Sequence, residues 1–393
     1  MQTVLPFQTL PKGLPFSKKV IYCLLDISGI QSYIFHAMDR HTTAGQVRSR
    51  SAYVESLGPR LQAILEKQFP GKLLSASPVG GNLRCLFHPS VDPAVLQTFL
   101  EKLQRAVFAS TEGKLTFFFA FCQAKCIPED RFCREKMCLA GAYLAQKLEA
   151  EKYQPRNLLK THMQQERVPL LTPPDQQADD EPPQTDQAAV KLDLDNLGTV
   201  FQKITAYDRH RQVSHSLNRH IKACLEADAR ISPVFAGGDD IFFLCPLAEF
   251  LPVVADFYRR LRLTLAKDPT LARYAQENFG LSAGISVILK NNRMSMSAYW
   301  EESEQALHLA KTEGQKNCVY LQLPAIHLHI AWEDLTFLAE VYSRPQVRAQ
   351  LFEQHRFKGA NLANLAELIQ QLQQTGLLTK KEMRRLDAIK SAL

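Results

Sequence analysis

A pair of glycines followed by a pair of aspartates lies between two apolar runs and restricts what this part of the chain can form. The motif Gly237–Asp240 separates the strand-like run Val234–Phe235 from the run Ile241–Leu244. Because glycine adopts positive φ without steric cost, the pattern predicts a β-hairpin with both carboxylates at its tip. Two carboxylates about 4 Å apart repel by roughly 4 kcal/mol at an effective dielectric constant near 20, and a divalent cation would turn that repulsion into attraction. Taken alone, the motif is equally compatible with an ordinary Gly-Asp turn.

A second acidic motif upstream favours the metal-site interpretation. An apolar strand that begins near Ala188 runs into the segment Lys191–Gly198, which ends in a glycine turn before a helical pattern. By itself this segment could be an ordinary turn or helix cap. A strand that brings one carboxylate beside a hairpin with two more is the arrangement of palm-type polymerase and cyclase sites, where two Mg²⁺ ions lie about 3.5–4 Å apart. We therefore predict Asp193, Asp239 and Asp240 as catalytic residues and as ligands of Mg²⁺ or Mn²⁺.

Backbone amides near these acids are candidates for holding nucleotide phosphates. Asn196, Leu197 and Gly198 lie at the predicted helix start, where N–H groups and the helix dipole favour phosphate. The amides of Gly237 and Gly238 are predicted to stabilise charge that develops during phosphoryl transfer. The two motifs together predict a nucleotide site with metal ions.

The first half of the chain repeats this pattern with most of its acids missing. Val20–Ile30 parallels the strand that leads into Asp193, and Pro78–Phe87 parallels the glycine hairpin. Asn82 and Leu83 stand where the second copy has its two hairpin aspartates. One copy is therefore expected to be catalytic and the other to bind or scaffold. Gly80 and Gly81 are candidates for binding the acceptor ATP, and Asp26, the equivalent of Asp193, is either a vestigial ligand or a hydrogen-bonding residue.

Several segments resemble one protein family. Leu25–Phe35 and Arg48–Tyr53 are similar to the first palm domain of the large subunit of type III CRISPR effector complexes. Asp193–Gly198, Gly237–Asp240 and Leu281–Ser286 are similar to its second palm domain. The resemblance covers roughly residues 20 to 320 and implies an α+β (α/β) fold with two ferredoxin-like palm or cyclase domains. A C-terminal helical domain would follow them and contact a small helical subunit.

The resemblance also implies an activity and partners. Members of this family are nucleotidyltransferases that convert ATP into cyclic oligoadenylate messengers in antiviral defence, and target RNA bound to the guide complex activates them. The implied partners are the CRISPR guide-complex subunits, guide RNA and target RNA. The segment that includes Lys311 and Lys316 resembles the phosphate side of diguanylate cyclases, where basic residues meet the triphosphate. The alternative for these two lysines is an ordinary solvent-exposed role.

The sequence departs from the family pattern in two places. Only about twenty residues precede the first palm strand, so we expect no N-terminal HD nuclease here, and residues 151–190 contain no cysteine, so we expect no zinc ribbon between the palms. Four of the nine cysteines cluster at positions 122, 126, 133 and 138, but their spacing does not match paired zinc knuckles. The odd cysteine count and the lack of a signal peptide or long apolar span predict a cytoplasmic protein without membrane anchoring.

Composition and periodicity predict the domain boundaries. With 393 residues, 46% of them hydrophobic, and a net charge of +7, the chain can build two or three cores and is compatible with RNA or nucleotide partners. The expected parts are an N-terminal extension (1–19), the first palm (20–165), an acidic, proline-rich linker (166–187), the second palm (188–325) and the helical domain (326–393). Thr379 and Glu382 predict a capping box for the last helix.

Three functions stay open at this point: a cyclase within an RNA-guided complex, a free-standing nucleotide cyclase, and a non-catalytic scaffold for RNA and subunits. The three intact acids of the second copy argue against the scaffold. The sequence does not decide the base, the ring size, the need for RNA, or whether Asp195 binds metal.

Overall fold

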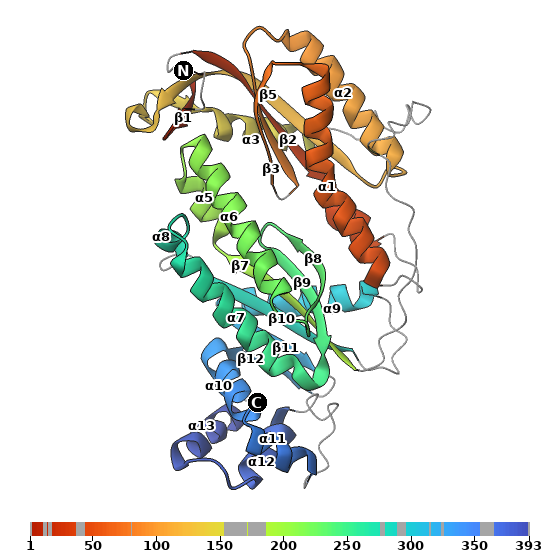
Figure 1. Ribbon diagram of the computed structural model, residues 1–393, viewed down its shortest axis with the longest axis vertical. Coiled ribbons are helices and arrows are strands. Elements are labelled where there is room, and N and C mark those ends of the chain that lie inside the picture. The colour runs from red at the N-terminus through yellow and green to blue at the C-terminus, as the bar shows by residue number, and fades with distance from the viewer. Residues whose placement is uncertain are drawn as a thin grey trace. The chain divides into compact units, whose positions relative to one another are not determined.

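The computed structural model describes residues 2–10, 14, 18–36, 44–79, 81–152, 171, 186–275, 280–288, 296–313, 316–323, 326–353 and 365–391 (Figure 1). These residues form two compact units, each built around one six-stranded sheet. The first unit comprises Met1–Ala37, Ser49–Gln177 and Gly198–Ser216, and the second comprises Met38–Arg48, Ala178–Leu197 and Leu217–Leu393. The fold class is confirmed: each unit is a mixed sheet with helices.

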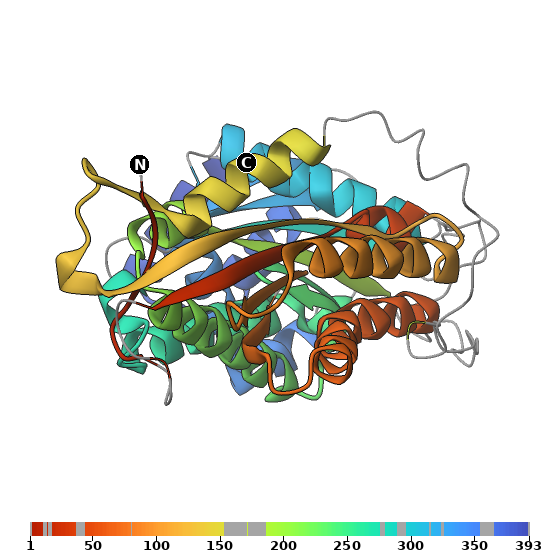
Figure 2. The same ribbon diagram turned by 90° about the horizontal axis from the view of Figure 1, so that it is seen from above.

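The sheet of the first unit has the strand order β3-β4-β2-β5-β1-β6. Its strands are β1 (Gln2–Phe7), β2 (Lys19–Ser28), β3 (Leu73–Val79), β4 (Asn82–Phe87), β5 (Thr116–Pro128) and β6 (Met137–Leu139). Its helices are α1 (Ala44–Gln68), α2 (Pro93–Ser110), α3 (Ala140–Lys152), α5 (Leu197–Lys203) and the first half of α6 (Tyr207–Glu226), together with short helical turns at Ser32–His36 and Glu129–Arg131. Seen from above, α2 and α3 lie on opposite sides of β5 (Figure 2).

Alternation along the strands produces the two faces of this sheet. Leu144 and Leu148 of α3 share a core with Tyr22 of β2 and with Phe118 and Ala120 of β5. The intervening residues of β5 therefore face α2, because successive side chains of a strand point to opposite faces. Helix α2 begins where its sequence favours a start: Pro93 occupies the first turn, and the carboxylate of the N-cap residue Asp92 accepts a hydrogen bond from the Ala94 amide at 2.8 Å.

The sheet of the second unit has the order β12-β11-β10-β7-β9-β8. Its strands are β7 (Gln187–Asp195), β8 (Ser232–Gly237), β9 (Asp240–Pro246), β10 (Gly280–Ile288), β11 (Cys318–Leu323) and β12 (Ile326–Ala331). Helix α7 (Phe250–Lys267) packs on one face, where the Phe257 ring lies 5.5 Å from that of Phe243, and α9 (Met296–Thr312) packs on the other. The remaining elements before the tail are the second half of α6, a turn at Leu247–Glu249 and α8 (Ala272–Ala275).

The predicted helical tail begins at Trp332, as the sequence indicates, and contains α10 (Trp332–Tyr342), α11 (Pro345–Glu353), α12 (Leu365–Gln374) and α13 (Lys380–Ser391). The Trp332 ring stacks on that of Tyr258 in α7, with 4.1 Å between their centroids. The capping box is confirmed: Thr379 N–H donates to the Glu382 carboxylate at 2.8 Å, and Glu382 N–H donates to the Thr379 hydroxyl at 3.3 Å. No helix in the described part of the chain is long and apolar enough to cross a membrane.

The predicted internal repeat is present in the strand pairing. Strands β3-β4-β2-β5 of one sheet and β8-β9-β7-β10 of the other have the same order, and all their pairings are antiparallel. Asp26 lies opposite Asn82 and Phe118, and Asp193 lies opposite Asp240 and Ser282. Asp26 and Asp193 therefore occupy equivalent positions in the two sheets.

The compact units differ from the predicted boundaries in several places. The start of α1 (Ala44–Arg48), expected in the first palm, belongs to the second unit. Strand β1 of the predicted extension pairs with β5, and β12 of the predicted tail pairs with β11, because a sheet edge gains hydrogen bonds from any strand that reaches it. Residues 198–216, expected in the second palm, belong to the first unit. Tyr207 packs there against Phe7 at 5.6 Å, and the Asp208 carboxylate accepts from the Gln8 and Thr9 amides at 3.0 and 2.8 Å.

One end of the predicted linker is part of the packed structure. Only Leu171, Asp186 and Gln187 of the predicted linker lie within the described part of the chain, and Gln187 is the first residue of β7. The Leu171 carbonyl accepts a hydrogen bond from the Tyr53 hydroxyl at 2.5 Å, and Leu171 is fully buried. This end of the predicted linker therefore packs against the first unit.

Candidate functional site

The hairpin predicted from the two glycines is present and joins β8 to β9. Gly238 has φ +70°, a conformation that glycine adopts readily, and Gly237 lies opposite Asp240. A Cβ atom on Gly237 would lie 2.7 Å from the ring of Phe235, so the first glycine is needed for space. The pairing of β7 with β9 places Asp193 directly opposite Asp240. The three predicted acids are therefore gathered at one end of three adjacent strands.

Burial and mutual repulsion raise the pKa values of two of these acids. Burial is the main cause that raises the pKa of Asp193 to about 6, and the charges of Asp239 and Asp240 act in the same direction. Burial, followed by the charge of Asp240, raises the pKa of Asp239 as well. Lys311, from the last turn of α9, opposes this effect: its Nζ lies 2.7 Å from Asp193 Oδ2. The acid cluster thus has an excess of negative charge that one lysine partly neutralises.

Lys191 is a buried cation that the sequence reasoning missed. It lies two residues before Asp193 on the same face of β7, with only 1% of its surface exposed. Its Nζ lies 3.4 Å from the centroid of the Trp300 ring and forms an ion pair with Glu304, both on α9. Burial lowers the pKa of Lys191 to about 8, whereas Asp240 and Asp193 raise it. The available signal was a lone lysine inside an otherwise apolar strand.

Asp195 organises the loops beside the site. It is 2% exposed, and its Oδ2 accepts a hydrogen bond from the Asn317 amide at 2.9 Å. Lys316 Nζ donates to Asn196 Oδ1 at 3.3 Å, which joins the end of β7 to the turn before β11. Asn196, Lys316 and Asn317 all have positive φ, at 63°, 65° and 48°. Asp195 therefore has an evident structural role, and the predicted lysine Lys316 lies beside the predicted amide segment.

The other predicted nucleotide-binding residues are placed differently. Leu197 is the first residue of α5. Gly198 follows it and belongs to the first unit, so a phosphate-binding role for Gly198 stays a prediction. Gly80 lies outside the described residues. Gly81 has φ +81°, and its carbonyl accepts from the Ile27 amide at 2.8 Å, so a hairpin role alone explains this glycine. Binding of an acceptor ATP at Gly80 and Gly81 also stays a prediction.

Asp26, the equivalent of Asp193, is held in the same way as its counterpart. Lys152, from the end of α3, places its Nζ 2.6 Å from Asp26 Oδ2. The pair reproduces the contact between Lys311 and Asp193 at the end of α9. Asp26 is therefore an ion-paired residue in the first unit, where the neighbouring strand offers Asn82 in place of a second acid.

The donor set suits a hard divalent cation, although its geometry here is not that of a formed metal cluster. Mg²⁺ and Mn²⁺ prefer carboxylate oxygens, and three carboxylates that repel one another supply them. As placed, no group of three His, Cys, Asp or Glu side chains within the described ranges is arranged to hold a metal ion. As placed, neither the three acids nor the cysteines at positions 122, 126, 133 and 138 form such a group. Lys311 at 2.7 Å from Asp193 instead provides the positive charge.

The raised pKa of Asp193 predicts a pH-dependent gain in stability on its replacement. The carboxyl pKa is 3.8 in the unfolded chain and about 6 in the folded chain, so the folded state binds the proton more tightly. The charged form therefore costs stability, and this cost is absent below pH 4, develops between pH 4 and 6, and is complete above pH 6. We expect Asp193→Asn to raise the free energy of unfolding by on the order of 2 kcal/mol at pH 7.5 and by much less at pH 4.

Denaturant titrations in metal-free buffer, followed by tryptophan fluorescence, measure this effect in the second unit, because both tryptophans, Trp300 and Trp332, lie there. The exposed Asp130→Asn is the control, with an expected change within about 0.5 kcal/mol. A loss of stability in Asp193→Asn at pH 7.5 would show that the ion pair with Lys311 outweighs burial and repulsion.

Two protein-family domain models match the chain. The model of the second palm domain of Cas10/Cmr2 matches residues 186–320, and that of domain B of the Csm1 subunit matches residues 20–165. Together the two matches span most of the chain, in the order first domain, second domain. A comparison with curated proteins finds no match.

Solved structures share the fold. A Csm1 from T. onnurineus superposes with a TM-score of 0.60 at 16% identity, over 93% of this chain and 66% of that one. A Csm1-Csm4 cassette in complex with cA4 gives 0.58 at 16% identity, over 94% of this chain and 64% of that one, and the cassette with AMPPNP gives the same values. This chain therefore spans less than two thirds of the length of these cassette chains. With its two palm units in the same order and its matches to both domains, the chain belongs to the Cas10/Csm1 family, the large palm-domain subunits of type III CRISPR effector complexes.

Proposed function

We propose that this chain converts ATP into cyclic oligoadenylate at the acid cluster of its second unit. The observation that carries the proposal is the register that sets Asp193 opposite Asp240, with Asp239 at the hairpin tip and Lys311 beside them. Charge repulsion in this cluster favours cations, and lysine is suited to phosphate. The similar cassettes with cA4 and AMPPNP support the choice of product and substrate, since their names record binding of such molecules by those proteins.

Asp193, Asp239 and Asp240 would hold the metal, Mg²⁺ or Mn²⁺. When bound, the ions would lower the pKa of an adenosine 3′-hydroxyl and neutralise charge on the triphosphate. Lys311 balances Asp193 in the structure described here, and metal binding would free its ammonium group for a phosphate oxygen. Lys316 and the backbone amides of Asn196, Leu197, Gly237 and Gly238 are the proposed further phosphate contacts. These groups would position the triphosphate and stabilise its charge.

Lys191 is proposed to act on the acids electrostatically from within the sheet, without contacting the nucleotide. Its charge is buried against Trp300 and Glu304, and the negative charges of Asp240 and Asp193 act on it directly. A fixed positive charge within the sheet favours the ionised form of nearby carboxylates. Metal ligands must be ionised to bind, so this lysine favours a cluster ready for metal.

We propose that the activity is controlled within a guide-RNA complex. The family membership supports this assignment, and the helical tail of the second unit is the proposed surface for contact with a small helical subunit. The partners would be guide-complex subunits, guide RNA and target RNA in the cytoplasm. A free-standing cyclase differs from this proposal in needing none of them.

Product yield with different RNAs tests the proposed control. We expect the isolated chain to make little cyclic oligoadenylate from ATP and Mg²⁺, and the yield to rise at least about tenfold, or 1.4 kcal/mol of bias, with guide-complex subunits and matched target RNA. Mass spectrometry of the products with matched, mismatched and absent target RNA measures this. Equal yields in all three conditions would instead indicate a free-standing cyclase, and no product in any would indicate a scaffold.

A further inference from the structure

Strand β5 of the first unit has one edge that is only partly paired. Along one edge, β2 pairs with Thr116 through Lys125. Along the other edge, the parallel strand β1 pairs only with Lys125 through Pro128. Within the part of the chain that the structure describes, no strand pairs with residues 116–124 on that second edge.

The backbone groups of this edge point outward at every second residue. Gln104 of α2 donates its side-chain N–H to the Phe117 carbonyl at 2.5 Å, so the backbone of Phe117 faces away from β2. Because the direction alternates along a strand, the N–H and C=O groups of Phe119, Phe121 and Gln123 face the same way. This edge therefore presents a row of donors and acceptors with the spacing of a strand partner.

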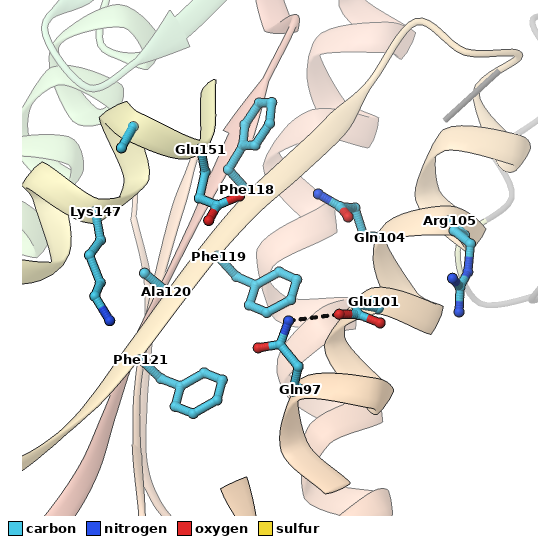
Figure 3. Close-up of a pocket in the computed structure, with 11 residues that line it drawn as sticks. Gln97, Glu101, Gln104, Arg105, Phe118, Phe119, Ala120, Phe121, Lys147 and Glu151 are labelled. Carbon is cyan, nitrogen blue, oxygen red and sulfur yellow. Dashed lines mark hydrogen bonds between the residues drawn. The ribbon is translucent and has the colours of Figure 1, made fainter. Parts of the chain in front are cut away.

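Two helices form walls on either side of this edge and leave a groove of about 630 Å³. Figure 3 shows the rings of Phe119 and Phe121 on the side of α2, near Gln97, and the side chains of Lys147 and Glu151 on the side of α3. The wall on the α2 side thus combines these rings with the amides of Gln97 and Gln104 and with the charged residues Glu101 and Arg105, whereas the wall on the α3 side carries charges of both signs. An extended segment placed along the edge would meet these two chemistries with alternate side chains.

The same position is filled in the second unit. Residues 283–286 of β10 pair with the parallel strand β11 at Val319–Gln322. Since Phe118 and Ser282 lie opposite the equivalent residues Asp26 and Asp193, residues 119–122 of β5 correspond to 283–286 of β10. The fold of the chain itself therefore shows that a parallel strand fits beside this stretch of a palm sheet.

The edge also lacks the features that keep exposed strands from pairing. Natural edge strands carry charges, prolines or bulges that block addition of another strand. The run Phe117–Ala124 contains no charged residue and no proline, and its pairing with β2 is regular throughout. Such an edge is expected to be covered when the protein is in its working state.

We propose that the edge of β5 at Phe119–Gln123 is a docking site for one extended segment of a neighbouring protein subunit, which adds to the sheet as a parallel strand. The segment would place apolar side chains against Phe119 and Phe121, and polar or charged side chains beside Lys147 and Glu151. This inference rests on the proposed assembly into a guide complex, because that assembly supplies the subunit. It adds the surface and the mode of contact.

Amide hydrogen exchange on the full chain, alone and in the reconstituted complex with its co-expressed subunits, tests the site. We expect the outward amides of Phe119, Phe121 and Gln123 to exchange at least about tenfold more slowly in the complex, because strand addition gives them acceptors. The inward amides already pair with β2 and serve as the internal reference. A complex that forms, as judged by size-exclusion chromatography, but leaves the outward amides unprotected would overturn the docking site alone.

A matched pair of variants separates strand addition from simple contact with the ring. Phe121→Pro removes the ring and one outward N–H without breaking the β2 ladder, whereas Phe121→Ala removes only the ring. We expect the proline variant to bind the subunits at least about tenfold more weakly than the alanine variant. Equal binding by both variants would contradict backbone pairing.

Two further outcomes would also count against the site. Protection of these amides in the isolated chain that increases with protein concentration would assign the edge to a second copy of the chain. Failure of the wild-type chain to form any complex would overturn the proposed assembly together with this site, and the chromatogram distinguishes that outcome from the others.

Discussion

Replacing Asp239 and Asp240 together by asparagine is expected to lower the rate of ATP conversion by at least about a thousandfold, equivalent to about 4 kcal/mol of transition-state stabilisation. The two side chains lie at the hairpin tip, and Asp240 faces Asp193 across the β7–β9 pairing. An amide keeps the size of the carboxylate and loses its charge, so the fold is retained while metal affinity is lost. The measurement is pyrophosphate release and oligoadenylate yield with Mg²⁺ and with Mn²⁺.

The matched control for this variant changes two acids away from the site. Asp130 and Glu135 are exposed residues of the first unit, so Asp130→Asn with Glu135→Gln alters the net charge equally and should keep wild-type activity. The melting temperature of the site variant should equal or exceed that of the wild type, because mutual repulsion contributes to the raised pKa of Asp239. A site variant that folds and retains wild-type turnover would show that the hairpin acids do not hold the catalytic metal.

The second large effect is expected at Gly284, where helix α9 crosses β10. A Cβ atom at this position would lie 2.3 Å from the Ser303 carbonyl oxygen and 2.3 Å from the Leu307 amide nitrogen. Both are helix backbone atoms, so the clash is relieved only by moving α9 away from the sheet. We expect Gly284→Val to destabilise the second unit by at least about 3 kcal/mol, and to lower activity because Lys311 lies on the same helix.

Thermal and denaturant unfolding followed by tryptophan fluorescence report this change, since Trp300 is itself on α9. Gly141→Ala is the matched control: Gly141 lies in α3, nothing lies within 4 Å of an added Cβ, and alanine favours a helix by about 1 kcal/mol over glycine. Wild-type stability in Gly284→Val would mean that α9 packs further from β10 than described.

Some features of the site could be predicted from the sequence, and others could not. The glycine hairpin, the strand into Asp193 and the capping box of Thr379 and Glu382 were predicted and are present. Each is determined within a few neighbouring residues, where glycine's backbone freedom, side-chain alternation and short hydrogen bonds act. The repeat of the palm pattern could be predicted for the same reason, because it consists of two copies of such local signals.

The contacts that complete the site are decided by pairing and packing between distant segments. Lys311 reaches Asp193 across 118 positions of sequence, and Lys191 meets Trp300 and Glu304 only because α9 crosses the sheet at Gly284. The sequence indicated Lys311 as a phosphate ligand through resemblance, but not its contact with the acid.

The strands that pair at the sheet edges likewise could not be predicted from the sequence. The sequence by itself determined two palm-type sheets and the acids that one of them carries. The tertiary structure decided that β1 and β12 join those sheets, that residues 198–216 belong to the first unit, and that no strand of the described ranges pairs with β5 at the position where β11 pairs with β10. The physical reason is that any extended segment that reaches the unpaired backbone groups of an edge strand can pair with them. Such backbone pairing leaves no local pattern in the residues.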